Sequence, residues 1–174
     1  MAKMGIFCGT AGGTSMVVAE ALADAFSIEE DDIINMEEDF DDVEEQLMEY
    51  DILFIGSSTW GQGDVHHSWV DPQLEIEDEG FDFSGKTVAL FGAGDSVKHG
   101  EHFCSALGKL HDTFKKAGAN VVGFMPTDGY SYEFSLAVKD GQFCGLPIDN
   151  HNEEDKTEER IEQWIDVLKK DLSL

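Results

Sequence analysis

The 174-residue sequence predicts an α/β fold with a doubly wound, five-stranded parallel sheet. Short β-rich runs alternate with amphipathic stretches along the whole chain, which is the pattern of strand–helix–strand units. Two of these runs, Ile52–Ile55 and Val88–Phe91, are wholly apolar, as strands buried on both faces of a parallel sheet are. A Gly-rich turn over 9–13 separates the first strand from the first helix. We therefore expect a ligand beyond the carboxyl ends of the strands.

Each element follows from its local pattern. The first helix places Val18 and Leu22 on one side, and the last helix has a stripe that includes Trp164 and Leu168. Gly118 ends the helix before the fifth strand. Strands are predicted over Lys3–Cys8, Asp32–Met36, Asp51–Ile55, Lys86–Phe91 and Asn120–Phe124. Helices are predicted over Thr14–Phe26, Phe40–Met48, His67–Ile76, Glu101–Lys116 and Glu153–Leu172.

The order of the five strands is expected to be 2-1-3-4-5, which is common for sheets of this kind. The ligand-binding edge then lies between strands one and three, and three loops meet there: Gly9–Ser15, Ser57–Asp64 and Gly92–Gly100. The chain has no repeat and no linker, so residues 1–174 are expected to form a single domain.

The charge of the chain is extreme, with 37 acidic against 11 basic residues and a formal net charge of −26. Such a charge argues against nucleic acid and anionic membranes as partners and favours basic protein surfaces. No apolar run approaches the roughly 20 residues of a membrane span. The start of the chain lacks a signal-peptide pattern, so we expect a cytoplasmic protein. Three scattered cysteines, Cys8, Cys104 and Cys144, are expected to be buried free thiols.

The first loop reads Gly9-Thr10-Ala11-Gly12-Gly13-Thr14-Ser15. Its glycines let backbone N–H groups converge at a helix N-terminus, which favours an anion. It contains no Lys or Arg, which argues against a nucleotide triphosphatase loop and against the Arg-closed loop of a low-mass tyrosine phosphatase. The dinucleotide pattern is also absent. A phosphate monoester held by amides and hydroxyls remains, beside the simpler interpretation of a capped strand-to-helix turn.

The second and third loops add a flat wall and further backbone donors. Trp60 lies between small polar residues, where a planar ligand can stack on it, although a lone Trp is more often a packing residue. Gly61 follows it and can rotate its peptide at little steric cost. The stretch Gly92-Ala93-Gly94-Asp95 can offer N–H groups to a ring carbonyl. The histidines His66-His67 and His99-x-x-His102 are interpreted as solvated, without a metal, because no further ligand completes a familiar spacing.

Together the three loops resemble flavodoxin, and the likeness extends to Thr127-Asp128-Gly129-Tyr130 and the last helix. The stretch Pro126–Pro147 resembles the insertion of the long-chain class. The resemblance implies a non-covalently bound flavin mononucleotide (FMN). The residues implied to bind it are Thr10, Ala11, Gly12, Gly13, Thr14 and Ser15 around the phosphate, Ser58, Thr59, Trp60, Gly61 and Gln62, then Gly92, Ala93, Gly94, Asp95, His99 and His102, and Asp149 near the ribityl chain.

The sequence departs from the family pattern at two places. Gly12 stands where a Ser or Thr is usual, so one hydroxyl donor to the phosphate is lost. His99 stands where a Tyr commonly stacks on the flavin. We interpret it either as an exposed loop residue or as a stacking group that titrates near neutral pH. Lys98 adds a second positive charge.

The resemblance implies a low-potential one-electron carrier, not an enzyme. It would be a monomer that shuttles electrons from a flavodoxin/ferredoxin NADP reductase to acceptor proteins. The alternative is an FMN-dependent NAD(P)H:quinone oxidoreductase of the same fold, for which the sequence shows no acid/base constellation. A phosphorylated receiver domain would need an Asp at the end of the third strand, where Gly56-Ser57 stands.

Overall fold

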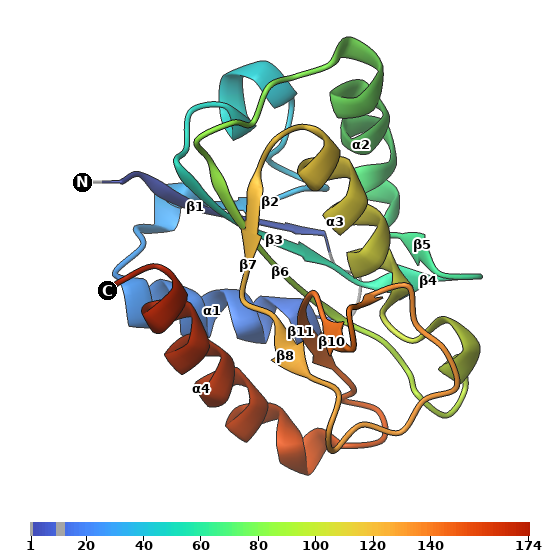
Figure 1. Cartoon of the computed structure of the whole chain (residues 1–174). Helices are drawn as coiled ribbons and strands as arrows, with labels where there is room; N and C mark the ends of the chain where they lie inside the picture. Colours follow the sequence, from blue (N-terminus) through green and yellow to red (C-terminus); the bar gives the residue numbers. More distant parts are fainter. Residues whose placement is uncertain (1, 10–12) are drawn as a thin grey trace.

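The computed structural model describes residues 2–9 and 13–174 (Figure 1). Its main sheet has the order β2-β1-β3-β6-β11, with all neighbours parallel, so the predicted order 2-1-3-4-5 is confirmed. The strands of this path are β1 (Met4–Gly9), β2 (Ile33–Asn35), β3 (Ile52–Ser57), β6 (Thr87–Ala93) and β11 (Gly145–Ile148). The middle strands are buried on both faces, as their apolar runs predict; Leu53, Phe54 and Ile55 have no exposed surface.

The fifth strand position is shared by two segments. β7 (Asn120–Val122) pairs with the first half of β6, and β11 pairs with the second half. The predicted strand Asn120–Phe124 is therefore too long, and Pro147 belongs to β11 instead of the predicted insertion Pro126–Pro147. Gly123 has a φ of 80°, which turns the chain out of the sheet directly after β7.

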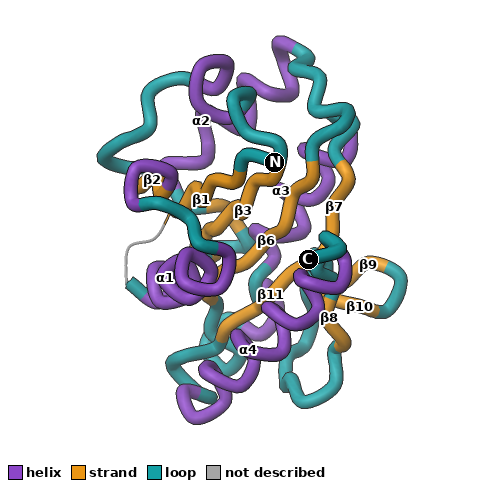
Figure 2. The backbone as a smooth tube through the Cα atoms, turned by 90° about the vertical axis from the view of Figure 1, so that its left-hand side faces the viewer, coloured by secondary structure: helices purple, strands orange, loops and turns teal. Residues whose placement is uncertain are grey.

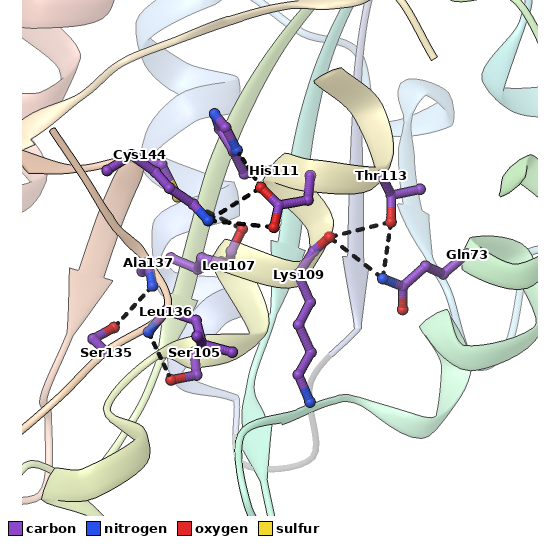
Figure 3. A network of polar contacts seen from close by, with 12 residues as sticks. Gln73, Ser105, Leu107, Lys109, His111, Thr113, Ser135, Leu136, Ala137 and Cys144 are labelled. Atoms are coloured by element: carbon purple, nitrogen blue, oxygen red, sulfur yellow. Dashed lines mark hydrogen bonds and ion pairs between the residues drawn. The ribbon is translucent and has the colours of Figure 1, made fainter. Parts of the chain in front are cut away.

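Segment 123–144, which we call the insertion, forms a small antiparallel sheet of its own. Its strands are β8 (Met125–Pro126), β9 (Val138–Lys139) and β10 (Gln142–Phe143), in the order β8-β10-β9. Figure 3 shows how α3 (Ser105–Lys116) holds this segment. The Ser105 hydroxyl accepts from the Leu136 N–H at 3.1 Å, and the Cys144 thiol donates to the Leu107 carbonyl at 3.6 Å. These polar contacts fix the insertion to α3.

Helices cover both faces of the sheet, as a doubly wound fold requires. α1 (Thr14–Phe26) and α4 (Glu154–Asp171) lie on one face, and α2 (His67–Glu79) and α3 lie on the other (Figures 1 and 2). α1 and α4 match the predicted helices within a residue at each end. On the second face, Gln73 of α2 donates to the Thr113 hydroxyl of α3 at 2.9 Å (Figure 3).

Several predicted helix bounds are wrong. The predicted helix Phe40–Met48 is only a single π-helical turn, η2 (Val43–Leu47), which buries Val43 and Leu47 and begins at the Asp42 cap. α2 runs three residues past the predicted Ile76, to Glu79. α3 begins at Ser105 instead of Glu101, because the chain first makes the short turn η3 (Gly100–His102). Another short turn, η1 (Glu30–Asp32), precedes β2.

All three cysteines are buried free thiols, as predicted. Cys104 does not lie early in a helix: it stands immediately before α3 with a φ of 52°. Among the residues that the structure describes, no helix is both long enough and apolar enough to cross a membrane.

Candidate functional site

β1, β3 and β6 end side by side at the carboxyl edge of the sheet, and a loop follows each of them. The first follows Gly9, the second follows Ser57 and the third follows Ala93. The predicted site residues Thr10, Ala11 and Gly12 lie outside the described part of the chain. The site is therefore built below from residue 13 onward.

The N-terminus of α1 is an anion-binding end. Gly13 caps it with a φ of 77°, a left-handed conformation that favours glycine, and Thr14 begins the helix. The Ser15 hydroxyl is buried and has no hydrogen-bond partner among the described residues. Its position at a helix N-terminus is one where an anionic ligand oxygen is favoured.

The second loop presents an aromatic side chain. A short hairpin forms at the predicted loop Ser57–Asp64, with two residues in each of its strands, β4 (Thr59–Trp60) and β5 (Asp64–Val65). Trp60 remains 51% exposed, although its indole N–H donates to the Ser58 hydroxyl at 2.8 Å. The Thr59 hydroxyl accepts from the Ala106 N–H at 3.3 Å and so ties the hairpin to α3. The Trp60 ring is thereby held in place with an open face.

The third loop is fixed by hydrogen bonds to β11 and to the residues that follow β11. The Gly94 N–H donates to the Ile148 carbonyl at 2.9 Å, and the predicted donation from N–H groups of the stretch Gly92–Asp95 to a ring stays a prediction. Asp95 accepts from the N–H groups of Val97 and Lys98 and from Asn152, at 3.2, 2.8 and 2.8 Å. Although desolvation raises the pKa of Asp95, these hydrogen bonds outweigh it and the pKa is lowered.

Asp149 is a support for this loop. It is fully buried, and its carboxylate accepts from the Ser96 hydroxyl and from the Asn152 side-chain amide. It lies behind the residues that line the site, and its predicted place near a ribityl chain stays a prediction. A Cβ on Gly92 would come 1.9 Å from the Ser57 carbonyl oxygen, so Gly92 serves the close approach of two strands.

The second and third loops, Thr14 and the residues after β11 line an open cleft of about 480 Å³. Nine predicted residues line it: Thr14, Ser58, Thr59, Trp60, Gly61, Ala93, Gly94, Asp95 and His99. Lys98, noted above for its charge, lines it too, as do Asn150 and His151, which the sequence reasoning missed. Gln62 and His102 instead line a neighbouring groove of about 450 Å³. Gly13, Ser15, Gly92 and Asp149 line neither hollow.

The chemistry of the cleft is that of binding. Its lining combines the exposed Trp60 ring, peptide groups of the Gly-rich third loop and, at one end, the α1 N-terminus. Lys98, His99 and His151 supply nitrogen-bearing side chains on a chain whose formal charge is −26. This arrangement suits a flat polar ring system that carries a phosphate.

The fold and this cleft define a doubly wound α/β protein with a phosphate-and-ring site at the topological switch point. Residues 6–164 match the model of the Flavodoxin family. The chain is 56% identical over 171 residues to Flavodoxin 1 of Azotobacter vinelandii, covering 98% of each. It is 35% identical over 172 residues to a Nostoc flavodoxin, covering 99% of this chain and 98% of that one. The chain belongs to the flavodoxin family.

A solved structure agrees with this assignment. The crystal structure of Fusobacterium nucleatum flavodoxin bound to flavin mononucleotide has a TM-score of 0.86 and 31% sequence identity, covering 98% of this chain and 99% of that chain. The 174-residue length and the insertion fit the predicted long-chain class.

Proposed function

We propose that this chain is a low-potential one-electron carrier that binds FMN non-covalently in the 480 Å³ cleft. The observation that carries the proposal is that the exposed Trp60 ring and Thr14, at the α1 N-terminus, line the same cleft. A phosphate monoester matches the second, and a flat ring matches the first. Flavodoxin of Fusobacterium nucleatum is bound to flavin mononucleotide, and this supports the same cofactor here.

The protein residues position the cofactor and tune its surroundings, while bound FMN supplies the one-electron chemistry. Thr14 and Ser15 would hold the phosphate, together with the predicted contacts Thr10, Gly12 and Gly13. Trp60 would cover one ring face. Gly61, with a φ of 52°, allows its peptide to turn. Asp95 would shape the loop at the other side of the cleft.

The acidic surface is the proposed docking surface for redox partners. A net charge of −26 attracts basic patches and steers encounter, at rates that fall as salt rises. A flavodoxin/ferredoxin NADP reductase and downstream acceptors with basic surfaces fit this chemistry. We further propose a single domain over residues 1–174, which the single main sheet supports, and a monomer. Three buried free thiols support a reducing compartment, the cytoplasm.

The proposal is tested by FMN titration of the apoprotein and by electron transfer with the loaded protein. We expect one FMN per chain, a flavin spectrum reduced in two one-electron stages, and weaker binding for Trp60→Ala. Val17→Ala is the matched control, because Val17 is similarly exposed (52%) but lies on α1 and does not line the cleft.

Reduction by NADPH should need a reductase, and its rate should fall with salt. Steady NADPH oxidation by the purified protein alone would instead support the quinone oxidoreductase. Absence of saturable FMN binding would contradict both.

A further inference from the structure

One side-chain amide joins two carboxylates beside the cleft. The Asn152 Nδ2 atom donates to Asp95 Oδ1 at 2.8 Å and to Asp149 Oδ1 at 2.9 Å. Asp95 belongs to the third loop, which follows β6, whereas Asp149 and Asn152 follow β11. Because an amide nitrogen carries two hydrogens, each carboxylate receives one of them. The bridge therefore connects the third loop to the end of a neighbouring strand.

The Asp95 end of the bridge controls the shape of the third loop. Its carboxylate also accepts from the N–H groups of Val97 and Lys98, and its backbone carbonyl accepts from the His99 N–H at 2.9 Å. Together these hydrogen bonds form a turn over residues 95–99. Lys98 and His99 of this turn line the cleft, so a displacement of Asp95 moves side chains of the cleft wall.

The Asp149 end of the bridge is fixed in the core. The Asp149 side chain is completely buried, and its other carboxylate oxygen accepts from the Ser96 hydroxyl. Its backbone carbonyl accepts from the Glu153 N–H at 2.8 Å, which closes a turn over 149–153 that includes Asn152. Among the residues that the structure describes, Asn152 alone is hydrogen-bonded to both carboxylates. It therefore links a fixed support to the exposed turn 95–99.

Without the amide, the two carboxylates would lose their common donor. Desolvation raises the pKa of Asp95, but its hydrogen-bond donors outweigh this effect and the pKa is lowered, so Asp95 is ionised near pH 7. A hydrogen bond to a charged group contributes more than one between neutral groups, and like charges repel. We therefore expect Asp95 to move away from Asp149 when the Asn152 side chain is truncated.

We propose that Asn152 is a positioning residue for the flavin ring: it holds the turn 95–99 against the buried Asp149 and so fixes Lys98 beside the bound ring. Asn152 does not line the cleft, so it acts through Asp95 and not by contact with the ligand. This inference rests on the proposed FMN binding. A loop that is already ordered binds a ligand more tightly, because no further ordering is needed on binding.

The test compares Asn152→Ala and Asn152→Leu with the unaltered chain in FMN titrations of the apoprotein. Both variants should weaken FMN binding by about tenfold, the effect expected for one hydrogen bond to a charged group. Asn152→Leu keeps the volume of the side chain, so it separates loss of the donor from loss of packing. The lower reduction potential should fall in both variants, because Lys98 is held less closely to the ring. Asn152 is exposed, so both variants should fold.

Two further measurements examine the path through Asp95. Amide hydrogen exchange of the apoprotein needs no flavin, and the N–H groups of Val97 and Lys98 should exchange faster in Asn152→Ala. In an Asp95→Ala background, Asn152 has no third-loop carboxylate to hold. Adding Asn152→Ala there should change FMN affinity by less than about twofold. Fully additive losses in the double variant would contradict the path.

The matched control is Gln46→Ala. The Gln46 amide also holds a surface turn, accepting from the N–H groups of Asp41 and Asp42 at 2.7 and 3.0 Å, but it does not line the cleft. Its loss should leave FMN affinity and the potential unchanged. Equal FMN affinity and equal potential in Asn152→Ala and the unaltered chain would overturn the positioning role, while the FMN binding of the unaltered chain would still support the proposed function. If the unaltered chain does not bind FMN, both proposals are wrong.

Discussion

The guanidinium carbon of Arg160 lies 3.8 Å from the centroid of the Tyr130 ring. Arg160 belongs to α4 and Tyr130 to the insertion, so this cation–π contact joins two parts of the fold. The same guanidinium donates to the Gly129 carbonyl at 2.8 Å and pairs with Glu153 at 3.1 Å. Only 9% of the Arg160 side chain is exposed. One nearly buried cation therefore anchors the insertion to the last helix.

Replacing Arg160 by Ala should lower the free energy of unfolding by about 3 kcal/mol, because it leaves Glu153 without its buried partner. Urea denaturation measures this change. Lys156→Ala is the matched control: Lys156 contacts the same Glu153 at 2.8 Å but is 46% exposed, so its loss should cost less than about 1 kcal/mol. Equal losses for the two variants would contradict the anchoring role of Arg160.

Gly108→Ala tests how closely the insertion approaches α3. In an open helix this change would stabilise by about 1 kcal/mol. Here the new Cβ would lie 2.1 Å from the Leu136 carbonyl oxygen, so backbone must move. Because overpacking costs about 1–3 kcal/mol, we expect a net loss of roughly 1 kcal/mol in thermal or urea unfolding. Lys115→Ala, at an exposed position on the same helix, should change the free energy of unfolding little. A stabilising effect of Gly108→Ala would show that the insertion can move away from α3 at little cost.

Much of the fold follows from local pattern, and the errors have a common cause. The apolar runs of β3 and β6 identify central strands, because a strand that is buried on both faces consists almost entirely of apolar residues. The π-helical turn η2 and the divided fifth strand were not predictable in this way. Asn120–Val122 and Gly145–Ile148 share one neighbour, β6, and that pairing is a long-range event which no local periodicity records.

The candidate site likewise contains residues that local pattern predicts and residues that only the folded chain brings together. Trp60 and Asp95 were found because they follow strands whose ends meet at one edge. Asn150 and His151 were missed because they follow β11, and only the closing of the sheet brings that end to the cleft. The interpretation of His66 as a solvated histidine is wrong, because its side chain is completely buried and sequence alone does not show burial. The Gly9 backbone and the Ser68 contact enclose its ring, and a motif search would see only a pair of adjacent histidines.

The lowered pKa of Asp95 predicts a pH window for stability. A carboxyl whose pKa is lowered by folding stabilises the protein fully above its ordinary value of about 3.9. The contribution is lost as pH falls through the lower, folded-state value. The stability difference between the unaltered chain and Asp95→Asn, at most about 1 kcal/mol, should be constant above about pH 5 and shrink below about pH 4. Urea unfolding at several pH values measures it; a difference that persists unchanged at pH ~3 would contradict it.

The three thiols should be inert in the native protein. Burial raises the pKa of Cys8 to about 12 and that of Cys144 to about 12, and it also raises the pKa of Cys104. Since the thiolate is the reactive form, a chromogenic disulfide reagent near pH 8 should modify no thiol before unfolding and all three in denaturant. One rapidly reacting thiol per native chain would show an opening that the packing does not predict.

Lys98 should raise the lower reduction potential of bound FMN. Its side chain lines the cleft beside the exposed His99, which stands where the family commonly has a Tyr. A cation there stabilises the more negative, reduced cofactor. At an effective dielectric of ~20 and a separation of ~8 Å, one charge contributes roughly 2 kcal/mol, which corresponds to some tens of millivolts.

Lys98→Gln should therefore lower that potential by some tens of millivolts, measured by stepwise reduction of the FMN-loaded protein. His99→Tyr is the matched comparison, since it changes the neighbouring residue that lines the same cleft and leaves Lys98 in place. An unchanged potential in Lys98→Gln would show that the lysine charge does not act on the flavin. If His99→Tyr keeps the original potential, the imidazole does not act on the flavin either, and His99 is simply an exposed loop residue at the rim of the cleft.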